Sequence, residues 1–296
     1  ERIIKNIKKK KPIFILGDYD VDGTSATSLL FLGIRELGGT VIPFIPNREF
    51  DGHGISERSI TKAIDSGADL FITCDCGINE SSVIEESKSL DLDFIITDHH
   101  IPGENVPEAL TILNPKQKGC EYPFKELSGS GVAFKLVSAL DLKLNKSNFL
   151  IKKIIDIAAL GTASDLVPLI GENRLIVHHG FEKVKSNSCI GIKTLFQKTN
   201  IKNFDELNVS NFNYKIAPLI NAAGRMNNAN IIIDLLTTED TRKASEISNR
   251  LIEENKKRQV IQRIALEEAF SKADQIDKKT KLILLHNDGW HPGVIG

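Results

Sequence analysis

Short apolar runs alternate with helical stretches over the first hundred residues of the chain. Four runs of four or five residues, nearly all apolar, each precede a polar loop and a stretch with helical spacing: 13–16, 41–45, 70–73 and 94–97. Runs that are apolar throughout are typical of strands buried on both faces, and strands separated by helices pair in parallel. The pattern therefore predicts an α/β fold with a parallel sheet covered on both faces.

The periodicity becomes helical from about residue 129 onward. Apolar residues recur at helical spacing over 129–141, 148–160, 174–184 and 190–198, and one long amphipathic helix is expected over 240–273. The apolar run 281–285 then predicts a strand that opens a second α/β domain. We therefore expect a main domain with a helical second half over 1–238, a long connecting helix over 239–276, and the start of another domain over 277–296.

Composition narrows the class of protein without revealing its partner. The 38 basic and 39 acidic residues leave a net charge of −1, so affinity for a polyanion would depend on where the charges lie. Four cysteines without a disulfide pattern predict a reduced, soluble, cytoplasmic protein. No stretch approaches the ~18 apolar residues of a membrane span, so no membrane association is expected. A start without Met and an end directly after an apolar run suggest part of a longer protein.

Three of the expected strands each end in an aspartate. Asp18, Asp75 and Asp98 follow the first, third and fourth runs, and His99 and His100 follow the last of these acids. One aspartate after a strand is an ordinary turn former or helix cap. The carboxyl ends of parallel strands, however, form the edge where α/β proteins bind ligands. Three acids and two histidines at that edge therefore predict a functional site.

The spacing of the first acids indicates a divalent metal. Asp18, Asp20 and Asp22 stand at alternate positions, and such crowded carboxylates repel one another unless a cation lies between them. The pattern argues against an EF-hand calcium loop, because Gly23 fits its sixth position but Leu29 stands at the twelfth, where a bidentate Glu is needed. Carboxylates together with imidazole suit manganese, zinc or iron. Mixed ligands from several loops predict a two-metal site, whose natural use is phosphoester hydrolysis.

Four motifs resemble, in order and spacing, those of the DHH phosphoesterase superfamily. They are Asp18 to Gly23, Asp75 in Cys-Asp-Cys-Gly, Asp98-His99-His100, and Asp165 at the end of the segment 159–165. Three further segments, 127–133, 221–226 and 290–296, resemble the RecJ-type branch, whose members are exonucleases specific for single-stranded DNA. The resemblance covers the whole chain. It implies a DHH catalytic domain over 1–238, the connecting helix, and the beginning of a DHH-associated domain over 277–296.

The resemblance also implies a set of site residues around Mn²⁺ or Mg²⁺, expected as two ions. The metal ligands would be Asp18, Asp20, Asp75, His99 and Asp165, with Asp98 and His100 as catalytic residues that complete or orient the site. Arg225 would contact the scissile phosphate, with Asn221, Gly224 and His291 beside the substrate. Many DHH enzymes have a histidine before the first acids, whereas this chain has only Phe14, Leu16 and Gly17 there.

Three residues keep an alternative interpretation. Asp22 could be a functional acid or an ordinary Asp-Gly helix entry. His53 could reach the substrate or lie in a solvated loop, and the loop is the simpler interpretation. Arg225 could bind a phosphate through bidentate hydrogen bonds from its guanidinium, or it could be a buried structural partner of an acid.

The leading hypothesis for function is 5′→3′ hydrolysis of single-stranded DNA in repair and recombination. The expected partners are single-stranded DNA itself and, for the full-length protein, a single-strand-binding protein or a helicase. A small-substrate DHH phosphatase or oligoribonuclease would use the same metal site but would not need the RecJ-type segments. An inactive DHH relative that acts as a replication scaffold would have lost several ligands, and none of the core ligands is missing here.

Overall fold

The computed structural model describes the chain except residues 48–49, 145–147, 200–206, 226–228, 277–279 and 296. Met226 and Gly296, which belong to two of the motifs above, therefore lie outside the described residues. Within the described ranges, no helix is both long enough and apolar enough to cross a membrane.

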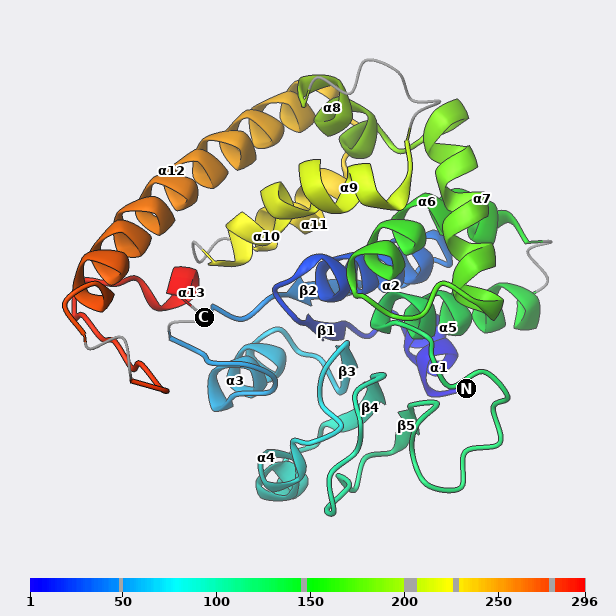
Figure 1. Ribbon diagram of the computed structural model, residues 1–296. Helices are drawn as coiled ribbons and strands as arrows, with labels where there is room; N and C mark the ends of the chain where they lie inside the picture. Colours follow the sequence, from blue (N-terminus) through cyan, green and yellow to red (C-terminus); the bar gives the residue numbers. More distant parts are fainter. Residues whose placement is uncertain (48–49, 145–147, 200–206, 226–228, 277–279, 296) are drawn as a thin grey trace.

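The core of the fold is a five-stranded parallel sheet (Figure 1). Its strands are β1 (Ile13–Gly17), β2 (Val41–Phe44), β3 (Leu70–Cys74), β4 (Asp93–Thr97) and β5 (Thr111–Leu113), in the order β2-β1-β3-β4-β5. Every neighbouring pair is parallel. The predicted α/β fold is confirmed, and four strands begin and end within one residue of their predicted bounds. β5 was not predicted, because three partly exposed residues carry little periodicity.

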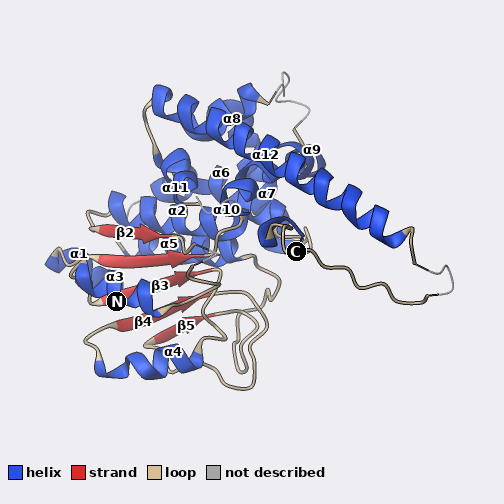
Figure 2. Cartoon of the chain, turned by 90° about the vertical axis from the view of Figure 1, so that its left-hand side faces the viewer, coloured by secondary structure: helices blue, strands red, loops and turns tan. Residues whose placement is uncertain are grey.

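Helices cover both faces of the sheet (Figure 2). On one face the strands pack against α2 (Val21–Glu36), α5 (Gly129–Lys143) and α6 (Phe149–Ser164). On the other they pack against α3 (Glu57–Asp65) and α4 (Ser81–Glu86), which the short helix η1 (Ser87–Ser89) follows. Because side chains alternate along a strand, Ile13 and Ile15 enter the first layer and Phe14 and Leu16 the second. This explains why the strand runs are apolar throughout.

Eight further helices complete the described part of the chain. Their bounds are α1 (Arg2–Lys9), α7 (Gly171–Asn187), α8 (Ile190–Lys198), α9 (Val209–Lys215), α10 (Ala217–Arg225), α11 (Asn230–Thr237), α12 (Thr241–Ala273) and α13 (Pro292–Ile295). The predicted long helix is confirmed as α12, which begins after the capping residue Asp240. Its first half packs on α8 and α10, and its second half extends beyond them (Figure 1).

The predicted strand over 281–285 is wrong. The described residues 280–295 contain no strand, and Leu282 and Leu284 are 83% and 92% exposed. An apolar run becomes a strand only where a neighbouring strand accepts and donates its backbone hydrogen bonds. No such neighbour exists in the described part of this chain, so the segment is irregular. The domain boundaries at 238 and 276 remain predictions.

Candidate metal centre

Three neighbouring strands bring their terminal aspartates to one edge of the sheet. Asp18 follows β1, Asp75 follows β3 and Asp98 follows β4. Each acid extends the ladder by one rung, since its backbone N–H donates to the next strand: Asp18 to Cys74 O at 3.2 Å, Asp75 to Thr97 O at 2.9 Å, and Asp98 to Leu113 O at 3.1 Å. The sheet itself therefore sets the spacing of these three carboxylates.

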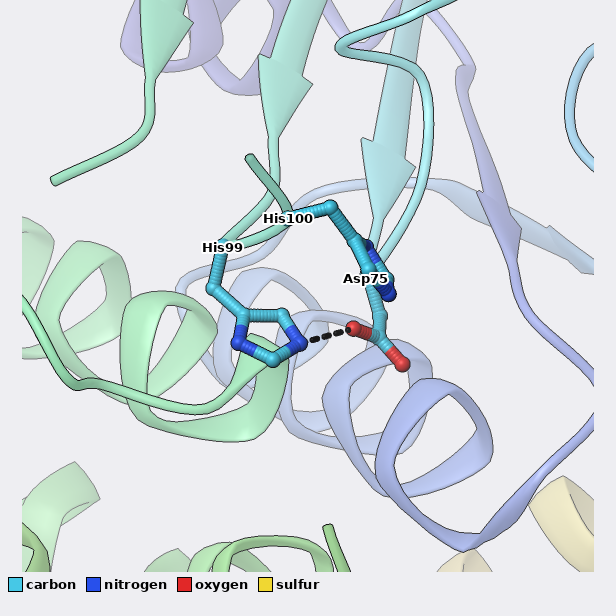
Figure 3. Close-up of side chains that lie close together, drawn as sticks. All are labelled: Asp75, His99 and His100. Atoms are coloured by element: carbon cyan, nitrogen blue, oxygen red, sulfur yellow. Dashed lines mark ion pairs between the residues drawn. The ribbon is translucent and has the colours of Figure 1, made fainter. Parts of the chain in front are cut away.

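His99 lies at the centre of the acidic cluster. Its Nε2 is 3.1 Å from Asp75 Oδ1, 3.5 Å from Asp165 Oδ2 and 4.0 Å from Asp22 Oδ2. Figure 3 shows its ring beside the Asp75 carboxylate, which comes from the neighbouring strand end. Asp165 comes from the helical layer and not from a strand end, since it directly follows the last residue of α6.

Three overlapping sets of ligand atoms could each hold a cation. The atoms of each set lie within 4.8 Å of one another, and the sets are Asp18, Asp20 and Asp75; Asp75, His99 and His100; and Asp22, His99 and Asp165. Asp75 and His99 each belong to two sets. The structure thus brings together all five residues expected as metal ligands.

Unsatisfied buried atoms show that these residues fit a divalent cation. Asp75 Oδ1, Asp165 Oδ2 and both ring nitrogens of His99 are buried without a hydrogen-bond partner. Buried polar atoms normally have a partner, and leaving several of them unsatisfied is costly unless bound ions accept their lone pairs. Carboxylate oxygens suit Mn²⁺ and Mg²⁺, and the imidazole of His99 adds a nitrogen donor that is typical of transition-metal sites.

Burial and mutual repulsion raise the pKa values of several acids in the cluster. Burial raises the pKa of Asp75 well above its usual value, and the charges of Asp22, Asp20, Asp18 and Asp165 raise it further. Burial, together with neighbouring acids, raises the pKa of Asp165 to about 8 and that of Asp20 to about 7. Burial lowers the pKa of His99, which keeps the imidazole neutral and able to donate to a metal.

We expect the metal-free chain to lose stability as the pH rises from about 5 to about 8. The folded pKa values of Asp75, Asp20 and Asp165 lie above the unfolded value of 3.8. The folded state therefore binds more protons in this window, and the stability present at low pH is lost as the pH passes the folded values. The lowered pKa of His99 makes stability rise with pH, which is the opposite effect. The three acids outnumber this one histidine, so we expect the net stability to fall.

Melting temperatures in chelator, measured across that pH range, test this expectation. Excess Mn²⁺ displaces the extra protons, so the stabilisation by metal should grow with pH over the same window. A metal-free melting temperature that rises from pH 5 to pH 8, or a metal effect that is constant, would contradict the assignment.

Asp22 holds the start of α5 against the cluster. Its Oδ2 accepts a hydrogen bond from Gly129 N at 2.6 Å and its Oδ1 one from Ser130 N at 2.9 Å. These are amides of the first turn of α5, where N–H groups have no partner within the helix. A side chain at Gly129 would put its Cβ 2.4 Å from Asp75 Oδ1, so only glycine allows this approach. Asp22 is therefore more than the entry residue of α2.

Asp98 orients the two histidines that follow it. Its Oδ1 accepts from His99 N at 2.7 Å, from His100 N at 3.0 Å and from His100 Nδ1 at 2.7 Å, while Oδ2 accepts from Ile78 N at 3.0 Å. Burial alone would raise the pKa of Asp98, but these hydrogen bonds outweigh it and hold the pKa below the usual value. The arrangement favours the orienting role among the two expected for Asp98.

The segment after β5 braces His100 and was missed in the sequence. The buried side chain of Asn114 donates from Nδ2 to His100 O at 2.9 Å and accepts at Oδ1 from Lys116 N at 2.8 Å. The positive charge of Lys116 also lowers the pKa of Asp165, although burial outweighs it. Polar residues directly after the apolar triplet 111–113 were the available signal, but the triplet is too short to predict a strand.

α10 packs against the loop that carries the first acids. Asn221 Oδ1 accepts from Val21 N at 3.1 Å, and a Cβ at Gly224 would lie 2.4 Å from Tyr19 O. Arg225, at the end of α10, donates from Nη1 to Gly293 O at 2.8 Å. The contacts of Asn221 and Gly224 position the loop, and their expected substrate contacts remain predictions.

Two of the histidines outside the Asp98-His99-His100 motif, His53 and His291, lie beside other expected site residues. His291 is next to Arg225 in space, because Gly293 N donates to His291 Nδ1 at 3.1 Å and Gly293 O accepts from Arg225. The ring of His53 reaches Asp18, with its Nδ1 3.1 Å from Asp18 Oδ1. His53 lies in a loop with its side chain 54% exposed, as the simpler interpretation expected, but its ring also contacts an expected metal ligand.

Comparison with known proteins agrees with this geometry. The family model "DHH family, N-terminal domain" matches residues 12–162. The single-stranded-DNA-specific exonuclease RecJ of Bacillus subtilis is 38% identical over 296 residues, covering 100% of this chain and 37% of that protein. RecJ of Thermus thermophilus is 34% identical over 98% of this chain and 42% of its own length. The chain thus spans less than half the length of either relative.

A solved structure has the same fold and contains a metal. The crystal structure of an exonuclease RecJ bound to manganese matches with a TM-score of 0.88 at 32% identity, over 99% of this chain and 73% of that one. RecJ of Thermus thermophilus in complex with Mn²⁺ matches with a TM-score of 0.86 at 31% identity, over 100% of this chain and 42% of its own.

Proposed function

Because the chain belongs to the DHH family, and within it to the RecJ branch, we propose that it is the catalytic core of a metal-dependent exonuclease that degrades single-stranded DNA. The observation that carries this proposal is the cluster of buried, unsatisfied carboxylate and imidazole atoms at the carboxyl edge of the sheet. The names of the relatives support single-stranded DNA as the substrate. We propose 5′→3′ polarity, a cytoplasmic location and a role in DNA repair and recombination on the RecJ resemblance alone.

The proposed chemistry divides the residues of the cluster by task. Bound divalent ions, Mn²⁺ or Mg²⁺, would activate a water and neutralise charge on the attacked phosphoryl group. The proposed ligands are Asp18, Asp20, Asp75, His99 and Asp165. Asp75 would be shared between two ions, since it belongs to two of the three sets.

The other proposed residues orient ligands or bind the substrate. Asp98 would keep His99 and His100 in place through its hydrogen bonds. His100, whose side chain is 49% exposed, would face the phosphate or donate a proton. Arg225, beside the segment that contains His291, would bind the scissile phosphate.

One substrate panel tests the proposal. The protein is incubated with 5′-labelled single-stranded DNA, duplex DNA, short RNA and pyrophosphate, each with Mn²⁺, Mg²⁺ or chelator. We expect cleavage of single-stranded DNA with metal, and no cleavage in chelator. Preferred hydrolysis of pyrophosphate or short RNA would establish the small-substrate alternative, and metal binding without hydrolysis would establish the scaffold. Pull-down with a single-strand-binding protein or a helicase tests the proposed protein partners.

Substitution of Arg225 is expected to separate phosphate binding from a structural role. Arg225→Lys keeps the charge but loses the bidentate hydrogen bonds of the guanidinium. We therefore expect kcat/KM to fall by about 10²-fold, or ~2.7 kcal/mol, with little change in melting temperature. Arg225→Ala should lose more activity. Arg263→Lys, on the exposed face of α12, is the matched control. A destabilised Arg225→Ala protein whose folded fraction cleaves normally would assign Arg225 a structural role.

A further inference from the structure

We propose that His53 is a positioning residue of the metal centre, which holds the Asp18 carboxylate through a hydrogen bond from its Nδ1. The two atoms, His53 Nδ1 and Asp18 Oδ1, are 3.1 Å apart. A carboxylate that ligates a metal can only accept hydrogen bonds, so in the proposed centre the imidazole would donate from Nδ1–H. The inference rests on the proposed metal centre and adds to it a residue from a fourth loop, the one after β2.

The neighbouring acids of Asp18 are held by backbone amides, whereas Asp18 is held by a side chain. Asp20 accepts from Gly23 N at 2.9 Å as the cap of α2, and Asp22 accepts from the first turn of α5. Among the residues that the structure describes, His53 is the hydrogen-bond donor to the Asp18 carboxylate. The orientation of this ligand therefore depends on where the loop after β2 places one imidazole.

That loop is built to place His53. The Asp51 carboxylate is 1% exposed and joins the start of the loop to α3, since Oδ2 accepts from Asn47 N at 2.7 Å and Oδ1 from Arg58 Nη1 at 3.0 Å. Gly52 and Gly54, on either side of His53, have φ values of +77° and +76°. Residues with a side chain rarely adopt this conformation, so the two glycines set the direction of the His53 backbone.

The surroundings of the ring restrict it further. Its edge packs on the Tyr19 ring, with 6.1 Å between centroids and an angle of 78° between planes. A Cβ at Gly54 would lie 2.2 Å from Glu80 Oε1, so the loop is in close contact with the β3–α4 connection. The imidazole thus contacts both the Tyr19 ring and the Asp18 carboxylate.

The consequence for function follows from the place of Asp18 in the cluster. Asp18 shares a set of ligand atoms with Asp20 and Asp75. Groups that orient a metal ligand without touching the metal typically contribute 10- to 100-fold to metal affinity, as order-of-magnitude values. The loss of His53 should therefore weaken metal binding much more than it weakens the metal-free fold.

Two amide substitutions provide the sharpest test. The amide nitrogen of asparagine occupies the position of Nδ1 relative to the backbone, whereas that of glutamine occupies the position of Nε2. Manganese affinity is measured for His53→Asn, His53→Gln and His53→Ala from the rise in melting temperature with added Mn²⁺. His178→Ala removes an exposed histidine on α7 and is the matched control.

We expect His53→Ala and His53→Gln to weaken manganese binding by about 10-fold or more, and His53→Asn to stay within about threefold of the wild type. Melting temperatures in chelator should differ little among the variants. Unchanged affinity in His53→Ala, or in His53→Gln if the alanine variant does not fold, would overturn the inference. If the wild type itself shows no metal-dependent stabilisation, the proposed centre is wrong and the inference falls with it.

Discussion

Replacement of Asp75 by asparagine is expected to abolish metal-dependent cleavage and to raise the melting temperature of the metal-free chain. Asp75 belongs to two of the three ligand sets, so its loss removes a ligand from both proposed ions. We expect turnover to fall by at least about 10³-fold, or ~4 kcal/mol of transition-state stabilisation. The apo form should gain stability, because burial and four neighbouring acids oppose ionisation of this carboxyl.

The backbone decides which substitution tests this cleanly. Asp75 has a φ of 62°, in the left-handed region, which asparagine tolerates and alanine does not. Alanine would therefore add backbone strain to the loss of the ligand. Asp91→Asn, at an exposed position, is the control for the change of charge. Wild-type turnover of the Asp75→Asn protein at saturating manganese would show that Asp75 is not a shared ligand.

Replacement of Asp22 by alanine is expected to destabilise the chain by about 2–4 kcal/mol, because it leaves the buried N–H groups of Gly129 and Ser130 without an acceptor. Part of this loss is offset, since the charge of Asp22 also opposes ionisation of Asp75 and Asp165. Metal binding should weaken in parallel, as the start of α5 moves away from Asp75.

Denaturant unfolding in chelator and manganese titration together measure both effects. Asp240→Ala is the matched control, because Asp240 also caps a helix but is exposed, and its loss should cost about 1 kcal/mol. Asp22→Asn keeps one acceptor oxygen and should fall between the wild type and Asp22→Ala. If Asp22→Ala unfolds at the same denaturant concentration as Asp240→Ala, Asp22 does not hold α5 and is an ordinary helix entry.

Much of the fold and part of the centre could be predicted from the sequence. Apolar runs buried on both sides are a local signal, so the four longer strands and α12 were found within about a residue of their true ends. Parallel strands share one carboxyl edge, so Asp18, Asp75 and Asp98 could be placed together before any coordinates were known. Asp165 required the family resemblance, because it ends a helix and no strand pattern leads to it.

The tertiary structure alone decided which partner each of these side chains has. The contacts of Asp22 with α5 join residues more than 100 positions apart, and no local pattern encodes such a pair. His53 is a loop histidine in the sequence, and only the tertiary structure places its ring beside Asp18, 35 positions away in the chain. The segment 281–285 shows the converse, since its apolar run forms no strand without a neighbour. Periodicity specifies which secondary structure each segment can form, whereas long-range packing and hydrogen bonding determine which residues each segment contacts.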